Sequence, residues 1–128
     1  MCQAEDSIAA GVDWLAPSFG NIHGVYPTGG PKLEFDRLER IRDTVGDRVR
    51  LILHGAHEQY FQQELFRGCI DLGMSKVNIN GVVNNACLET QQRLAGKASL
   101  MEIMEESTTA MQAVIETHCD WLMSAGKA

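Results

Sequence analysis

Short apolar segments alternate with longer amphipathic segments along this chain. The apolar segments are residues 12–18, 49–53 and 76–79, and each ends at polar, glycine-containing residues that precede a helical pattern. This strand-then-helix order is typical of βα units that form a parallel sheet. The pattern therefore predicts an α/β fold with three parallel strands.

The helical segments are marked by apolar residues that recur at every third or fourth position. Residues 34–45 and 59–72 show this spacing, and each is closed by a glycine, the usual residue after a helix end. A long final helix is predicted to begin at Ser99, because Ser99 and Glu102 have the spacing of a capping box. Residues 7–10 resemble the end of a further helix.

The lengths of the units fit a (β/α)8 TIM barrel. Eight units of the lengths found here give the roughly 250 residues of a typical barrel. The chain has 128 residues. We therefore expect residues 1–128 to form an incomplete domain: a partial TIM barrel with about the last three βα units and the C-terminal helices.

Composition narrows the function classes. The formal net charge is −6, from 11 Lys and Arg and 17 Asp and Glu, which disfavours nucleic-acid binding. No apolar run approaches the ~18 residues of a membrane span, and the first residues lack the pattern of a signal peptide. Four scattered cysteines fit a reducing compartment, where we interpret them as small buried apolar residues. These features predict a cytoplasmic protein.

Polar residues gather just after each predicted strand, at residues 21–24, 54–57 and 78–81. In a barrel these positions converge on one mouth. His23 and His54 each stand directly before a glycine, and two imidazoles from adjacent strands can share one zinc ion. A single such histidine is more often a buried structural residue, but its repetition in consecutive units favours a metal site.

Glycines in these turns suggest an anion site. Gly24, Gly55 and Gly81 leave backbone N–H groups unshielded, and barrels often bind phosphate in the loops after their last two strands. Here those loops are residues 54–58 and 78–82. Ordinary turn glycines are the alternative explanation.

Two further features of these loops bear on a ligand. Asn78 and Asn80 alternate with apolar residues, so that along a strand both amides would face one side and suit a polyhydroxylated ligand. Polar packing inside a barrel explains the same pattern. His57 either donates to an anion or is an exposed loop residue, whereas His118 lies in the final helix and is expected to pack or to face solvent.

The sequence resembles one family, the class II, zinc-dependent fructose-bisphosphate aldolases. Residues 11–26, GVDWLAPSFGNIHGVY, resemble that family's GVD-x-LA…GN-x-HG-x-Y segment, and residues 53–55 resemble its second HG motif. Residues 73–80, GMSKVNIN, are similar to its G-x-x-KVNID segment, and residues 124–128 to its C-terminal ending. The resemblance covers the C-terminal part of the family's barrel and does not separate fructose from tagatose bisphosphate as substrate.

The resemblance implies zinc-assisted, reversible aldol cleavage of fructose 1,6-bisphosphate to dihydroxyacetone phosphate and glyceraldehyde 3-phosphate. His23 and His54 would be two of three zinc ligands, and the general-base Asp is expected upstream, so no catalytic residue is assigned within this chain. The full-length protein would be a homo-oligomer. The resemblance, with the loop argument above, assigns the phosphorylated sugar to Gly24, Gly55, Ala56, His57, Asn78, Ile79, Asn80 and Gly81.

Two loops depart from the family pattern. Residues 54–58 read HGAHE where the family usually has HGGSG, and residues 78–81 read NING where it has NIDT. A non-catalytic partial barrel that binds zinc or a sugar phosphate, or only pairs with another chain, is therefore the alternative to an aldolase fragment. On either reading we expect the isolated 128 residues to be inactive.

Overall fold

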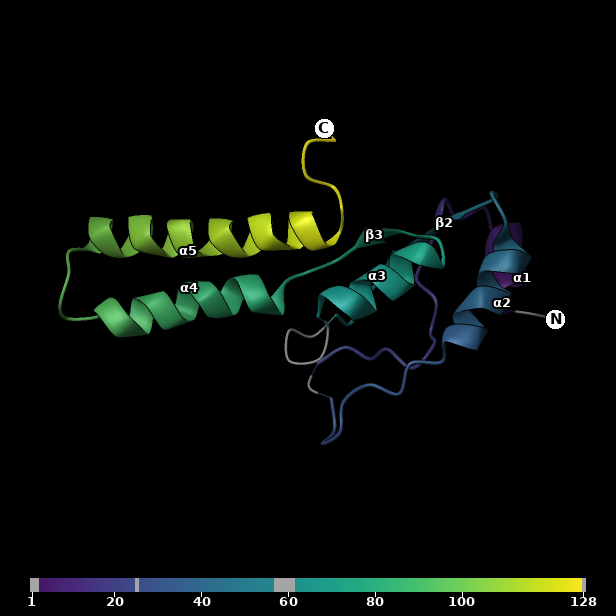
Figure 1. The fold of residues 1–128 in the computed structure, drawn as a ribbon, viewed down its shortest axis with the longest axis horizontal. Helices are drawn as coiled ribbons and strands as arrows, with labels where there is room; N and C mark the ends of the chain where they lie inside the picture. Colours follow the sequence, from purple (N-terminus) through teal and green to yellow (C-terminus); the bar gives the residue numbers. More distant parts are fainter. Residues whose placement is uncertain (1–2, 25, 57–61, 128) are drawn as a thin grey trace. The chain divides into compact units, whose positions relative to one another are not determined.

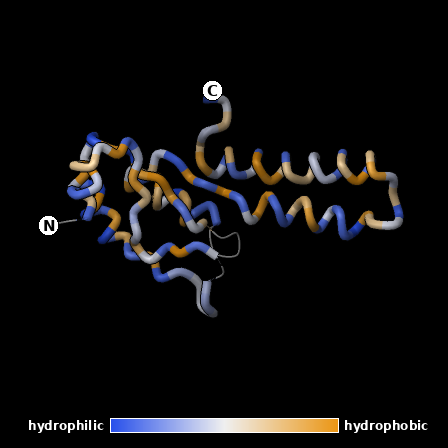
Figure 2. The backbone as a smooth tube through the Cα atoms, turned by 180° about the vertical axis from the view of Figure 1, so that it is seen from behind, coloured by the Kyte–Doolittle hydropathy of each residue, from blue (hydrophilic) through white to orange (hydrophobic). Residues whose placement is uncertain are grey.

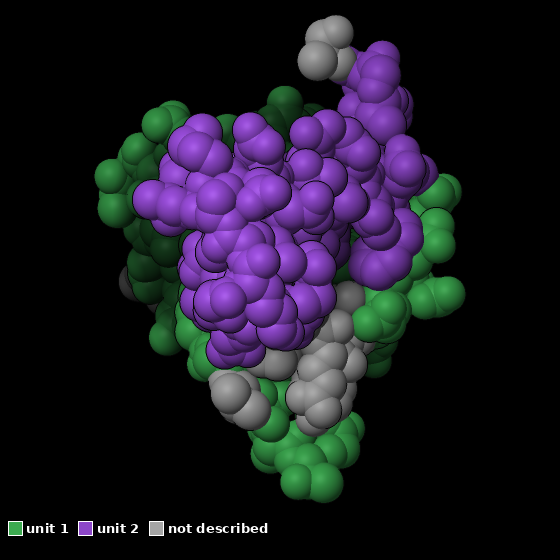
Figure 3. All heavy atoms as spheres, turned by 90° about the vertical axis from the view of Figure 1, so that its left-hand side faces the viewer, with its two compact units in different colours: residues 1–78 green, residues 79–128 purple. Residues whose placement is uncertain are grey.

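The computed structural model describes residues 3–24, 26–56 and 62–127. The chain forms two compact units, residues 1–78 and residues 79–128, which are coloured separately in Figure 3. The first unit holds the sheet and the helices that precede and follow its strands, and the second is a helical hairpin (Figure 1). Each unit is described by itself.

The sheet of the first unit is parallel throughout, as the sequence predicts. It consists of β1 (Trp14–Leu15), β2 (Arg50–Leu53) and β3 (Met74–Val77), in the order β1-β2-β3 with β2 in the centre. Leu51 and Leu53 are buried, as expected for the central strand. The carboxyl ends of all three strands therefore lie at the same edge of the sheet.

Helices flank this sheet in the predicted order. They are α1 (Gln3–Ala9), α2 (Phe35–Val45) and α3 (Gln63–Asp71), with α1 against α2 and α3 against β3. Helix α2 ends at Gly46, whose φ of +53° suits glycine and whose N–H donates to the Arg42 carbonyl. The apolar core of the described residues lies in this unit and comprises Ala4, Phe19, Tyr26, Leu38, Val45, Val49, Leu51, Leu53, Phe66, Cys69 and Met74.

Two predicted strands differ from the observed ones. The first is only Trp14–Leu15 instead of residues 12–18, and the third is Met74–Val77 instead of residues 76–79. The third strand starts earlier because Met74 is buried and pairs with Leu51 of β2. The prediction that Asn78 and Asn80 alternate along a strand is therefore wrong, since both follow the strand.

The second unit consists of α4 (Gly81–Leu94) and α5 (Leu100–Trp121), which run antiparallel side by side (Figure 1). Hydrophobic and hydrophilic residues alternate along both helices (Figure 2). The predicted capping box is confirmed: the Ser99 hydroxyl accepts from the Glu102 N–H, and the Glu102 carboxylate accepts from the Ser99 N–H. Hydrogen bonds from Ser99 lower the pKa of Glu102.

His118 of α5 has a packing role, one of the two expectations from the sequence. Its side chain is buried, with Nδ1 2.8 Å from the Val114 carbonyl oxygen and the ring centroid 5.0 Å from that of Trp121. Among the residues that the structure describes, no helix combines the length and the apolar character needed to cross a membrane.

Candidate metal and phosphate site

The structure brings the two predicted metal ligands together. His23 lies in the loop after β1, and His54 directly follows β2, the neighbouring parallel strand. Their ring centroids are 5.3 Å apart and their planes are inclined by 58°. Two imidazoles on one tetrahedral zinc, with Zn–N bonds of about 2.1 Å, have centroids about 5 Å apart. The observed separation therefore fits a shared metal ion.

Two side chains tie the loop of His23 to the loop of His54. The Asn21 amide donates to the His54 carbonyl oxygen at 3.0 Å, and the Tyr26 hydroxyl donates to the Gly55 carbonyl oxygen at 2.9 Å. The same hydroxyl accepts from the Ile22 N–H at 2.9 Å. Burial raises the pKa of the Tyr26 phenol, the hydrogen bond from Ile22 opposing this rise, so that Tyr26 keeps the proton it donates.

The backbone of Gly55 packs closely against the same loop. Its φ is +74°, and a Cβ built there would lie 2.2 Å from the Ile22 carbonyl oxygen. No residue with a side chain fits without moving one of the two loops. Gly24, which follows His23, also has a positive φ, of +90°, but a Cβ there would meet nothing within 4 Å. The two glycines of the paired HG motifs thus have different structural roles.

The imidazole of His54 also contacts Asn78, which follows β3. The Asn78 amide nitrogen lies 3.0 Å from His54 Nε2 and 3.5 Å from Nδ1. Lys76 donates to the Asn78 amide oxygen at 2.6 Å, which orients the NH2 group toward the ring. The amide nitrogen thus lies close to both ring nitrogens of His54, and the donor and acceptor roles in this contact depend on the tautomer of the ring.

The donor set fits part of a zinc coordination sphere. His23 and His54 supply two imidazoles, and within the described ranges no third His, Cys, Asp or Glu completes a cluster with them. A neutral imidazole has one lone pair, so His54 would offer a metal one ring nitrogen. A protein zinc site of the catalytic kind would need a third ligand in addition to these two.

The remaining predicted site residues stand as follows. Ala56 is half-buried directly after Gly55, and His57 lies outside the described residues. Ile79, Asn80 and Gly81 belong to the second unit, where the Asn80 amide oxygen accepts from the Asn84 side chain at 2.9 Å. The structure therefore brings together His23, His54, Gly55 and Asn78, while the assignment of residues 79–81 to substrate stays a prediction.

Sequence reasoning gave no role to Asn21, Tyr26 or Lys76, although each interacts with this cluster. Asn21 and Tyr26 flank His23 within residues 11–26, the segment that carries the family resemblance. Their place in this motif is the sequence signal that points to a role for them. Their hydrogen bonds reach across to residues 54 and 55, a separation that no local periodicity reveals.

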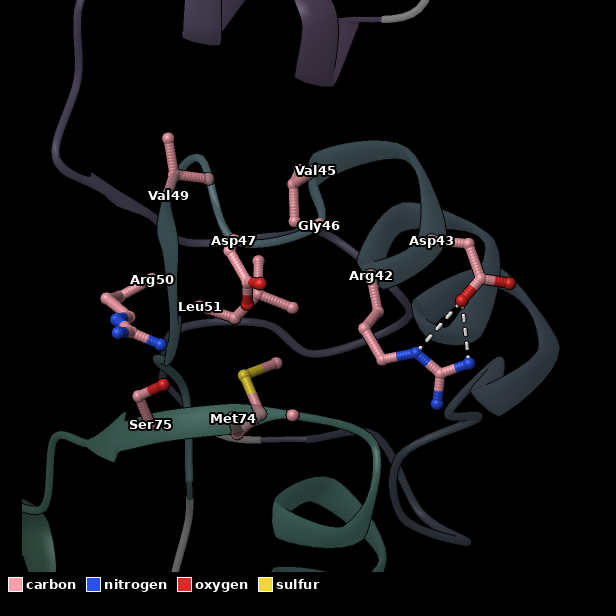
Figure 4. Close-up of a pocket in the computed structure, with 11 residues that line it drawn as sticks. Arg42, Asp43, Val45, Gly46, Asp47, Val49, Arg50, Leu51, Met74 and Ser75 are labelled. Atoms are coloured by element: carbon pink, nitrogen blue, oxygen red, sulfur yellow. Dashed lines mark hydrogen bonds and ion pairs between the residues drawn. The ribbon is translucent and has the colours of Figure 1, made fainter.

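A hollow lies at the other end of the strands (Figure 4). It has a volume of about 610 Å³ and is lined by the amino ends of β2 and β3 and by the turn after α2. The Arg42 guanidinium there pairs with Asp43 and Glu39, and the hydrogen bond to Asp43 raises the pKa of Arg42. No histidine or cysteine lines this hollow. His23 and His54 thus lie outside this hollow.

The fold and the histidine pair define an α/β protein with candidate metal ligands at the carboxyl ends of parallel strands. Residues 2–127 match the family model described as fructose-bisphosphate aldolase class-II, and the chain belongs to that family. This bears out the resemblance deduced from residues 11–26, 53–55 and 73–80.

Individual relatives agree with this family. The chain is 44% identical over 126 residues to a Coccidioides immitis protein named "Putative fructose-bisphosphate aldolase", covering 98% of this chain and 41% of that protein. A crystal structure described as that of a putative fructose-1,6-biphosphate aldolase from the same organism superposes with a TM-score of 0.93 at 44% identity. The match covers 98% of this chain and 43% of the solved chain. The crystal structure of the YdjI aldolase of Escherichia coli K12 superposes with a TM-score of 0.86 at 30% identity, covering 98% of this chain and 45% of the solved chain. The chain thus spans less than half the length of these relatives.

Proposed function

We propose that this chain carries part of the active site of a class II ketose-bisphosphate aldolase, with fructose 1,6-bisphosphate as substrate. The observation that carries the proposal is the His23–His54 pair, with ring centroids 5.3 Å apart on the loops after adjacent parallel strands. Membership of the aldolase family supports the reaction class. The reaction is the reversible cleavage to dihydroxyacetone phosphate and glyceraldehyde 3-phosphate.

Residues 1–128 correspond, in this proposal, to the C-terminal part of a (β/α)8 barrel. Support comes from the parallel order β1-β2-β3 and from the superposition on 43% of a solved aldolase chain with a TM-score of 0.93. The site lies where barrel enzymes place their chemistry, at the carboxyl ends of the strands. A homo-oligomeric full-length protein in the cytoplasm belongs to the same proposal, by analogy with the family.

Each residue of the cluster has a proposed task. His23 and His54 would hold Zn²⁺, which when bound would supply Lewis-acid polarisation of the substrate ketone. The backbone N–H groups after His23 and His54, at Gly24 and Gly55, bind the phosphate of the sugar. Asn78 would offer its amide to the oxygens of the three-carbon ketose. The general-base Asp would come from a part of the protein outside this chain, as the family resemblance implies.

A non-catalytic chain that binds zinc or a sugar phosphate is the second candidate. The observation that favours it is the changed sequence of the two loops, HGAHE at residues 54–58 and NING at residues 78–81. A carboxylate at Glu58 would oppose a phosphate if it lay nearby. This second function needs the same histidines, so binding and turnover must be measured separately.

The test combines ligand binding and turnover on the 128-residue chain. Binding of dihydroxyacetone phosphate is measured by calorimetry with and without zinc, and cleavage of fructose 1,6-bisphosphate by the release of triose phosphate. We expect zinc-dependent binding that His54→Ala abolishes, and turnover near background. Binding that ignores zinc would contradict the proposed site. Zinc-dependent turnover that His54→Ala abolishes would show that these residues also supply a base.

A further inference from the structure

We propose that Tyr26, together with Asn21, acts as a positioning residue for the metal-binding histidine pair. Its hydroxyl joins the loop that carries His23 to the loop that follows His54. This inference rests on the proposed metal-binding function and deepens it. Neither side chain is assigned to touch metal or substrate.

The Tyr26 hydroxyl is engaged on both sides. It accepts from the N–H of Ile22, the residue before His23, and donates to the carbonyl oxygen of Gly55, the residue after His54, each at 2.9 Å. The tyrosine is 4% exposed, so water does not readily replace these bonds. One buried hydroxyl thus links the backbone next to one ring with the backbone next to the other.

Asn21 provides a second, independent link. Its amide NH2 donates to the His54 carbonyl oxygen at 3.0 Å, while its amide oxygen accepts from the Phe19 N–H at 2.9 Å. The side chain therefore holds its own loop in shape with one end and reaches the neighbouring loop with the other. Together the two residues bond to consecutive carbonyl groups, those of His54 and Gly55.

Such links matter because a metal site tolerates little displacement of its ligands. Coordinating groups must be held within about 0.5 Å of their productive geometry. His23 and His54 come from different loops, so their 5.3 Å separation depends on how these loops are fastened to each other. Outer residues that orient ligands typically change metal affinity by about 10- to 100-fold when they are lost.

Two variants remove one link each with little change in shape. Tyr26→Phe deletes only the hydroxyl that bridges Ile22 and Gly55. Asn21→Asp keeps the oxygen that accepts from the Phe19 N–H and removes the NH2 group that reaches His54. Thr44→Val is the matched control, because the Thr44 hydroxyl donates only within α2, to the Arg40 carbonyl oxygen.

The first measurement is made without metal: the nuclear Overhauser effect between ring protons of His23 and His54. We expect this signal in the wild type and in Thr44→Val, and its loss in Tyr26→Phe. The second measurement is the zinc dissociation constant by competition with a chelating dye. We expect it to rise about 10-fold in Tyr26→Phe, with the Co²⁺ absorption spectrum altered, and to stay unchanged in Thr44→Val.

An undiminished ring-to-ring signal in folded Tyr26→Phe would overturn the proposal. If Tyr26→Phe fails to fold, Asn21→Asp decides: loss of the signal supports the proposal and an unchanged signal overturns it. A wild type that shows the signal but binds no zinc, with the signal lost in Tyr26→Phe, would refute the metal-binding function and leave the positioning role supported. The two failures are thereby distinguished.

Discussion

Gly55→Ala is the substitution whose cost the structure specifies best. A methyl group at residue 55 would lie 2.2 Å from the Ile22 carbonyl oxygen and 2.7 Å from its carbonyl carbon. These are backbone atoms, which cannot rotate out of the way as a flexible side chain does. The loops of His23 and His54 must therefore separate.

The magnitude follows from two contributions. Alanine at the φ of +74° costs about 1–2 kcal/mol by itself. Separation of the loops also breaks the hydrogen bonds from Tyr26 and Asn21, and a buried group left without its partner costs about 1–3 kcal/mol. Gly24→Ala isolates the first contribution, because residue 24 has a φ of +90° and open space around its Cβ position. Two such groups amount to about 2–6 kcal/mol, and we expect Gly55→Ala to be less stable than Gly24→Ala by a difference in this range.

Amide hydrogen exchange at β2 is the assay, because residues 51–53 lie in the central strand and report on the opening of this unit. We expect protection to fall in both variants, and to fall further in Gly55→Ala. Zinc affinity should drop in Gly55→Ala more than in Gly24→Ala, because only the former moves the two histidine loops apart. Equal protection in the two variants would refute the close packing of Gly55 against Ile22.

Three further outcomes are expected. Burial raises the pKa of the Cys69 thiol from 9.0 to about 12, so the contribution of this thiol to stability is complete below pH 9 and is lost as the pH rises toward 12. Urea unfolding should therefore show that the free energy of unfolding falls by about 2 kcal/mol between pH 8 and pH 10.5 in the wild type but not in Cys69→Ala. The same pH dependence in both proteins would contradict this. Ser99→Ala should destabilise α5 by about 1 kcal/mol, and unchanged amide exchange in the first turn of α5 would argue against a working capping box. The Asn78 amide lies against the His54 ring, so Asn78→Ala should weaken zinc binding about 10-fold by loosening that ring, whereas unchanged binding would mean that this contact does not hold the ring.

Much of the fold follows from local sequence patterns. Helix α2 and the start of α5 match their predictions because an apolar stripe and a capping box are signals contained within a few residues. The parallel order of the strands follows from their alternation with helices. The bounds of α4 do not follow from a local pattern, because residues 81–94 are polar over much of their length. The strand predicted at residues 76–79 begins two residues too late, because the start of β3 is set by its pairing with β2.

The site was predictable only in part. Parallel neighbouring strands end at the same edge, so the approach of His23 and His54 could be expected from their positions after successive strands. The links through Asn21 and Tyr26 could not, because they depend on how two irregular loops fold against each other. The contact between Asn78 and His54 likewise depends on Lys76, which orients the amide.

The most direct test of the central claim is X-ray absorption spectroscopy of the zinc-loaded chain, compared with His23→Ala and His54→Ala. We expect the wild type to bind one zinc ion, with the scattering pattern of two imidazoles at about 2.0–2.1 Å. Each alanine variant should lose one imidazole contribution and bind zinc more weakly. A wild-type spectrum without imidazole scattering, or one that neither substitution changes, would contradict a metal site at the His23–His54 pair.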